Sequence, residues 1–227
     1  MKGRPYYIEF VGQHTAGKTT IIHAIVDGGL LEPRIAVYPQ QLRRARWHFV
    51  LSLPLLILTN AHHLLFVAAF FVGKAKWQWT NYQDVARHIF KMVLLHPYYH
   101  RYQFDIWMKD DMLHFLPRIL FREGIGIEKA FLQFFDHFAF LYDGLVFVEI
   151  PHAVMQERFA ARFKTQSQQR KTTREPIYEH AFAQNVALLQ VLKQQSKVPL
   201  LILDGCRETK ENTMRVVSFI NSEVIKN

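Results

Sequence analysis

The residues from Gly12 to Thr19 combine types and spacing suited to holding a chain of phosphate groups. They fit the pattern G-x-x-x-x-G-K-[ST] at every fixed position. Glycines let a backbone curl until successive N–H groups point inward at phosphate oxygens. We expect Lys18 to bridge β- and γ-phosphate oxygens, and the Thr19 hydroxyl to bind Mg²⁺, which prefers oxygen ligands. The predicted nucleotide-binding residues are Gly12, Gln13, His14, Thr15, Ala16, Gly17, Lys18, Thr19 and Thr20.

The residues around this loop supply the strand and the helix that such a site needs. Tyr6–Val11 is a short β-rich run, and Thr19–Val26 is a helical pattern that ends at two glycines. The positive N-terminal end of that helix adds to the attraction for phosphate. The context therefore predicts a strand, a phosphate-binding loop and a helix in direct succession.

The rest of the chain predicts an α/β protein of three layers, with helices on both faces of a parallel sheet. Apolar strands without polar alternation, separated by helices, are typical of that architecture. Further strands are expected at Pro117–Phe121, Leu145–Ile150 and Val198–Leu203, with a short one near Ile35–Val37. Helices are expected at Ile127–Leu141, Ala153–Phe163, Pro176–Gln195 and Lys210–Val224, and a polar loop at Lys164–Arg174.

These elements indicate one domain, residues 1–227, with an inserted part. The core is predicted at about 1–40 and 116–227, and a mostly helical, apolar, acceptor-binding subdomain at about 41–115. A lid is predicted at about 158–176.

Composition narrows the class of protein and of partner. Half of the residues are hydrophobic and 21% are charged, which is globular composition. The net charge of +9 favours anionic partners such as nucleotides, sugar phosphates or an acidic membrane surface. No nucleic-acid motif is present and the basic residues are scattered, so we expect no nucleic acid as a partner. The single Cys206 excludes an internal disulfide framework and favours a reducing, cytoplasmic location.

Two apolar runs, Phe49–Leu58 and Leu64–Val72, flank a short polar group that includes Asn60 and His62-His63. Each run is about ten residues, whereas a membrane-spanning helix needs roughly 20. Two buried helices that meet at a turn, with the two histidines pointing apart, are one interpretation. The alternatives for residues 49–72 are a dimer interface, and a peripheral segment that touches lipid or a protein partner, helped by the flanking Arg43, Arg44, Arg46, Lys74 and Lys76.

A GTPase would carry an Asn-Lys-x-Asp motif and a transporter ATPase a serine-glycine signature, and neither is present. The chain resembles the P-loop nucleoside and nucleotide kinases, most nearly the thymidylate-kinase-like branch. The resemblance rests on Ile8–Gly12 before the loop, Phe121–Gly124, Leu145–Pro151 before a helix bearing Arg158 and Arg162, and Val198–Gly205. The usual Asp-Arg pair after the second major strand is reversed here, as Arg122-Glu123.

The resemblance implies an ATP- and Mg²⁺-dependent phosphotransferase with a nucleoside, nucleoside monophosphate or sugar-type acceptor. The catalytic residues are then Lys18, Glu123, Arg158 and Arg162. Glu123 would accept the proton of the acceptor hydroxyl or hold Mg²⁺ through water. The alternative is that Glu123 is a carboxylate at a helix N-terminus, where the helix dipole stabilises it. A closing lid would bring arginines onto the transferring group, unless they form a solvated basic face.

Other residues are further candidates for binding or catalysis at the same site. Asp110 and Asp111 are alternative carboxylates, Glu9 lies beside the loop, Arg170 and Arg174 lie in the lid, and Arg34, Arg43, Arg44 and Arg46 are candidates for an anionic acceptor. The turn after Asp204 is expected at the adenine base, with Gly205 and Cys206 lining it and Arg207 stacking on it. The alternative function is a nucleotide-binding module that attaches to a membrane or a protein through residues 49–72.

Overall fold

The computed structural model describes residues 6–13, 15–31, 35–37, 54–55, 57–58, 60–72, 106–110, 127–162, 168–195 and 197–225. The strands are β1 (Tyr6–Gly12), β2 (Ile35–Val37), β3 (Ile106–Asp110), β4 (Gly144–Glu149) and β5 (Leu200–Asp204). The helices are α1 (Lys18–Asp27), α3 (Ala61–Val72), α7 (Ile127–Phe138), α8 (His152–Arg162), α9 (Gln168–Gln194) and α10 (Thr209–Phe219). A 3₁₀ turn, Ala139–Leu141, follows α7, and a π-helical turn, Ile220–Val224, follows α10.

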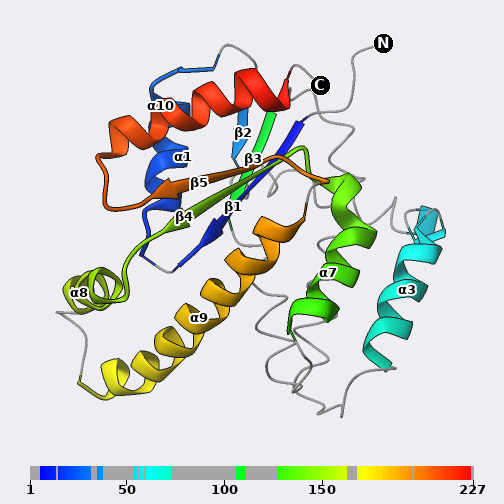
Figure 1. The fold of residues 1–227 in the computed structure, drawn as a ribbon, viewed down its shortest axis with the longest axis horizontal. Helices are drawn as coiled ribbons and strands as arrows, with labels where there is room; N and C mark the ends of the chain where they lie inside the picture. Colours follow the sequence, from blue (N-terminus) through cyan, green and yellow to red (C-terminus); the bar gives the residue numbers. More distant parts are fainter. Residues whose placement is uncertain are drawn as a thin grey trace.

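The five strands form one parallel sheet in the order β2-β3-β1-β4-β5. Helices α1 and α10 lie on one side of this sheet, and α7 and α9 lie on the other (Figure 1). The three-layer α/β/α architecture expected from the sequence is therefore confirmed. The chain leaves the sheet at the carboxyl end of β1, between β3 and β4, which is where open parallel sheets bind their ligands.

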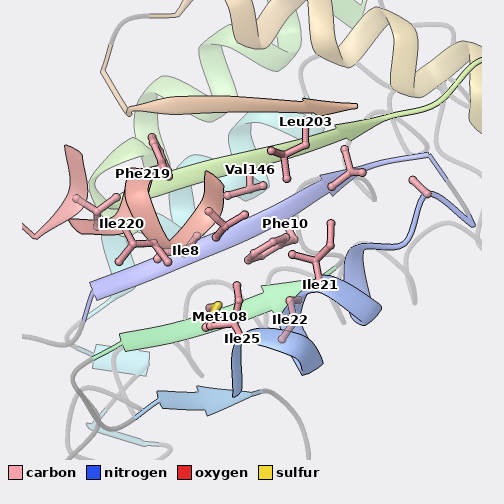
Figure 2. Packing of buried hydrophobic residues seen from close by; sticks show 14 of the residues in the cluster. Ile8, Phe10, Ile21, Ile22, Ile25, Met108, Val146, Leu203, Phe219 and Ile220 are labelled. Carbon is pink, nitrogen blue, oxygen red and sulfur yellow. The ribbon is translucent and has the colours of Figure 1, made fainter. Parts of the chain in front are cut away.

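The core under α1 and α10 fixes the strand that leads into the glycine loop. Ile8 and Phe10 of β1 are fully buried and point toward α1, whose Ile22 and Ile25 meet them, as Figure 2 shows. The far side of the same cluster comes from Phe219 of α10 and its neighbours. The spacing of Ile21, Ile22 and Ile25 on α1 places all three on one face of the helix, so the beginning of α1 is held close to the end of β1.

The opposite face of the sheet packs against a second, aromatic layer. Phe131, Phe135 and Phe138 of α7 are buried, and the ring of Phe135 stacks on Tyr142 at a centroid distance of 5.8 Å. Outside α7 lies α3, attached through rings: Phe66 stacks on His137 at 3.7 Å, with 7° between the two planes. The molecule therefore has an outermost apolar helix on this side (Figure 1).

Most of the elements expected from the sequence are confirmed, but the structure differs from the expectations in several places. Residues 106–110 lie in the segment expected to be mostly helical, yet they form β3 in the middle of the sheet. The predicted strand Pro117–Phe121 lies outside the described residues. The subdomain predicted at about 41–115 thus contains a core strand near its end, because Ile106-Trp107-Met108 suits a buried strand better than its polar surroundings suggest.

The polar loop expected at Lys164–Arg174 is largely helix, because α9 begins at Gln168 and continues through Pro176. Gln, Lys and Arg are good helix formers, so a polar run of this kind is compatible with a helix as well as with a loop. The sequence predicts a helix that begins at Pro176, but this proline lies inside α9, where it removes one backbone hydrogen bond. Part of the predicted lid is therefore a regular helix.

The apolar segment also differs from its simplest interpretation. Helix α3 includes His62 and His63, whose rings lie 3.8 Å apart rather than pointing in opposite directions. Leu65 on the same helix is 69% exposed, so α3 is not wholly buried. Within the described segments, no helix has both the length and the apolar composition needed to cross a bilayer.

Candidate functional site

The glycine loop leaves β1 in a conformation that only selected residues adopt. Gly12, Thr15 and Gly17 have φ angles of 132°, 63° and 93°, in the left-handed region. A Cβ on Gly12 would lie 2.1 Å from the carbonyl oxygen of Val148 on β4, so a side chain there would collide with the sheet. Gly17 ends the loop as the residue before α1. The loop thus makes the tight curl that a phosphate-binding backbone requires.

Lys18 lies inside this curl. Its side chain is only 6% exposed, and its ammonium donates to the carbonyl oxygens of Gly12 at 3.2 Å and Gln13 at 3.0 Å. A cation held at the start of α1 adds to the positive end of the helix dipole. The arrangement places a positive charge where an anion bound by the loop would lie.

Gln13 braces the loop against the next strand, a role that its place in the pattern does not reveal. Its side chain is 1% exposed, and its Oε1 accepts a hydrogen bond from the backbone N–H of Ile150 at 3.2 Å. The backbone oxygen of Gln13 also accepts from the N–H of Ala16 at 3.3 Å. The loop is therefore tied to the junction between β4 and α8. In the sequence, Gln13 occupies a variable position of the pattern, so the sequence carries no signal of this tie.

Arg158 connects three segments that are distant in the sequence. From α8 its guanidinium donates to the carbonyl oxygen of Thr15 at 3.2 Å and to that of Gly205 at 3.0 Å. The structure thus places this predicted catalytic residue against the backbone of the loop. Arg162 lies one turn further along the same helix and is exposed, and no contact among the described residues joins it to the loop.

The turn after β5 approaches the loop closely, as expected for a segment beside the nucleotide. The N–H of Gly205 donates to the backbone carbonyl oxygen of Glu149 at 2.7 Å, and a Cβ on Gly205 would lie 2.8 Å from the carbonyl oxygen of Ala16. Only glycine allows this approach. Arg207 is exposed and pairs with Glu211 and Asp204, so its stacking on a base stays a prediction.

Two acidic residues belong to the neighbouring strands β3 and β1. Asp110 ends β3, and its Cα is in register with that of Phe10, two residues before Gly12. It therefore lies at the carboxyl end of the sheet, on the strand beside the loop. Glu9 is fully buried and accepts a hydrogen bond from the Tyr7 hydroxyl at 2.7 Å.

The buried carboxylate of Glu9 influences a neighbouring phenol. Burial, and secondly the negative charge of Glu9, raise the pKa of Tyr142 well above its ordinary value. The ring centroids of Tyr7, near the amino end of β1, and Tyr142, which precedes β4, lie 5.5 Å apart. The carboxylate of Glu9 is therefore buried in the protein, beside Tyr7 and near Tyr142.

The residues present fit a nucleotide and a magnesium ion in their donor chemistry. The loop offers a curled backbone and Lys18 for phosphate, and Thr19 is an exposed hydroxyl in the first turn of α1. Oxygen donors of this kind suit Mg²⁺, which keeps several waters and needs few protein ligands. Among the residues that the structure describes, no three His, Cys, Asp or Glu side chains gather into a metal-binding group.

Several predicted site residues lie outside the part of the chain that the structure describes. They are His14, Arg34, Arg43, Arg44, Arg46, Asp111 and Glu123. The backbone of Arg170 and Arg174 belongs to α9.

Comparison with known proteins identifies the fold. No known family profile matches the sequence, and no curated protein sequence matches it. Among solved structures, the chain is similar to the deoxyadenosine kinase from M. mycoides with bound dATP, at 12% identity and a TM-score of 0.51, covering 95% of this chain and 100% of the kinase. It is also similar to TT1252 from Thermus thermophilus, at 15% identity and a TM-score of 0.44, covering 98% of this chain and 99% of that one. The chain has a P-loop nucleoside-kinase-like fold.

Proposed function

We propose that this protein is a phosphotransferase that moves the γ-phosphoryl group of Mg-ATP to a small-molecule acceptor. The observation that carries the proposal is the glycine loop with Lys18 held inside its curl, at the carboxyl end of the central strand of this fold. The net charge of +9 suits anionic substrates. The acceptor class is a nucleoside, a nucleoside monophosphate or a sugar, and the location is cytoplasmic.

In this proposal the chain's own groups position charge rather than form covalent bonds. Phosphoryl transfer depends mostly on alignment and on cations around the equatorial oxygens. Loop N–H groups and Lys18 hold the β- and γ-phosphates, and the Thr19 hydroxyl is a ligand for magnesium, which neutralises phosphate charge when bound. The acceptor oxygen forms a bond to the γ-phosphorus while the bond to the bridging oxygen breaks and ADP leaves.

The acceptor hydroxyl must lose its proton to a base. Asp110 lies at the end of the strand beside the loop, which is where side chains of an open parallel sheet meet the ligand. Glu123 is the other candidate base, because it follows the predicted strand Pro117–Phe121 in the sequence. We expect Asp110→Asn to lower kcat with little change in ATP affinity if Asp110 is the base, whereas Glu123→Gln would do so if the base is Glu123.

The first experiment measures ADP formation with a panel of nucleosides, nucleoside monophosphates and sugars. At least one soluble acceptor should stimulate ADP formation by the wild-type protein, and Lys18→Ala should lower that rate by about 100-fold or more. Lys210→Ala, which removes an exposed lysine from α10, is the matched control and should keep full activity. ATP binding without ADP formation for any acceptor would refute the phosphotransferase and leave a nucleotide-binding module.

A further inference from the structure

Polar side chains join helix α8, which carries Arg158, to the first half of α9 beside it (Figure 1). His152 Nε2 lies 2.5 Å from Glu179 Oε2, and Gln156 Nε2 donates to Glu179 Oε1 at 3.0 Å. Glu179 of α9 therefore holds two side chains of α8, one with each carboxylate oxygen. We call His152, Gln156 and Glu179 the α8–α9 clasp.

The carboxylate of Glu179 is the shared acceptor of the clasp. The hydrogen bond from Gln156 and, to a smaller extent, the contact with His152 lower the pKa of Glu179. An ionised carboxylate only accepts hydrogen bonds, so His152 and Gln156 are the donors. The side chains of His152 and Glu179 are 43% and 39% exposed, and exposed ion pairs contribute little to stability. Substitutions in the clasp should therefore leave the protein folded.

Glu179 extends from a part of α9 that is packed against the protein. Phe182 follows it by three residues, so the two side chains lie on the same face of the helix. The ring of Phe182 packs against the hydrophobic core that includes Met155 of α8, and its centroid lies 4.8 Å from that of His152. The acceptor of the clasp is thus held in place by contacts of its own helix.

Arg158 extends from a different side of α8. His152 and Gln156 are four residues apart and share one face of the helix, whereas Arg158 lies about 200° around the helix from Gln156. Met155 and Phe159 are buried and attach α8 to the protein. Apolar contacts are non-directional, whereas hydrogen bonds fix an orientation. The clasp therefore restricts rotation of α8 about its axis, and with it the direction in which Arg158 points.

We propose that the α8–α9 clasp is a positioning device for nucleotide binding, which acts through α8 to hold Arg158 against the glycine loop. This inference rests on the proposed function, because it concerns the loop that binds Mg-ATP. With the clasp closed, the guanidinium stays within reach of the carbonyl oxygens of Thr15 and Gly205, at 3.2 and 3.0 Å. Opening the clasp lets α8 rotate and releases that tie, so a contact between two helices changes the affinity for the nucleotide.

The first test measures the Kd of the full chain for Mg-ATP by calorimetry. Glu179→Ala removes the shared acceptor and should raise the Kd about fivefold, the size expected for two partly exposed hydrogen bonds to a carboxylate. The kcat at saturating ATP should stay within about twofold of wild type, because the clasp acts on binding. Glu179→Gln keeps an acceptor for Gln156 and should recover part of the affinity.

Glu157→Ala is the matched control, because it removes an exposed carboxylate from α8 itself. It should leave the Kd within about twofold of wild type. Loss of a negative charge alone would favour an anionic nucleotide in both variants, which is opposite in sign to the effect of opening the clasp. An unchanged or lower Kd in Glu179→Ala, or an equal rise in Glu157→Ala, would overturn the proposal.

A double-mutant cycle tests whether the clasp acts through Arg158. In the Arg158→Met background, Glu179→Ala should change the Kd less than about twofold, because the contact that the clasp positions is already lost. The same loss of affinity in both backgrounds would mean that the clasp acts independently of Arg158, and it would contradict the proposal.

Hydrogen exchange of the ligand-free protein separates failure of this inference from failure of the proposed function. Backbone N–H groups of residues 15–21 should exchange faster in Glu179→Ala and in Arg158→Met than in the wild-type protein, and Glu157→Ala should not change them. ATP binding without ADP formation would refute phosphotransfer, yet the Kd values would still decide on the clasp. Unchanged exchange in Glu179→Ala would overturn the clasp whether or not ATP binds.

Discussion

Replacing Arg158 with methionine tests whether this arginine acts on the glycine loop or on the transferring phosphoryl group. Its guanidinium joins Thr15 of the loop to Gly205 of the turn after β5, through hydrogen bonds of 3.2 and 3.0 Å. Methionine keeps much of the length and apolar volume of the side chain but removes all five donors. The two carbonyl oxygens then lose a shared partner, and the loop loses its tie to α8.

The expected magnitude follows from the two hydrogen bonds. A hydrogen bond to a charged group contributes about 1.5–3 kcal/mol when buried. Arg158 is only half-buried and the distances are long, so we take about 1 kcal/mol for each bond. If ATP binds only the ordered loop, a loss of about 2 kcal/mol raises the Kd for Mg-ATP by about 30-fold. The value of kcat at saturating ATP should change little.

Calorimetric titration gives the Kd for Mg-ATP, and steady-state rates at saturating ATP give kcat. Arg158→Lys should recover only part of the affinity, because one ammonium cannot reproduce the planar fork that bridges two carbonyl oxygens. Arg162→Met, one turn away and exposed, is the control and should bind Mg-ATP normally. A fall in kcat of about 1,000-fold with an unchanged Kd would refute our reasoning, because that is the signature of an arginine on the transferring group.

Three further predictions concern stability. Gln13→Leu leaves the buried N–H of Ile150 without its acceptor, which costs about 1–3 kcal/mol, and each kcal/mol lowers Tm by roughly 2–4 °C in a thermal melt. Gly12→Ala should abolish soluble expression or lower Tm further than Gln13→Leu does, because its Cβ would lie 2.1 Å from a β4 carbonyl oxygen; a smaller loss than that of Gln13→Leu would contradict the clash. Burial, then the nearby charges of His62 and His137, lower the pKa of His63 to about 4. Below its ordinary pKa of 6.5 the unfolded chain binds a proton that the folded chain resists, so Tm should fall as pH falls from 6.5 toward 4, and His63→Phe should flatten that slope.

The donor side of the site could be predicted because its requirements are local. Gly12, Lys18 and Thr19 stand at fixed spacing in one short loop, and the strand and helix on either side follow from patterns within about ten residues. A short strand near Ile35–Val37 was also expected, and β2 lies there. Local sequence is enough where chain connectivity itself brings the groups together.

The contacts that brace the loop could not be predicted because they join distant segments. The hydrogen bond from Arg158 to Thr15 spans 143 residues, and that from Ile150 to Gln13 spans 137. The i, i+4 spacing of Arg158 and Arg162 placed both on one helix face, but it could not tell which one faces the loop. Strand β3 was missed for a related reason, since its five residues gain their stability from pairing with β1 and β2.

These long-range contacts make the conformation of the glycine loop a property of three elements together. Gln13 ties it to the end of β4, Arg158 ties it to α8, and Gly205 closes against Ala16 from the turn after β5. A ligand that needs the curled loop must also bind more weakly when any one of these ties is lost, even at a residue that never touches it. Because Arg158 contacts both the loop and the turn, substitutions at Gln13 and Arg158 should show a coupling energy in a double-mutant cycle of ATP binding. Simple additivity of the two effects would mean that the loop is held by independent contacts rather than as one unit.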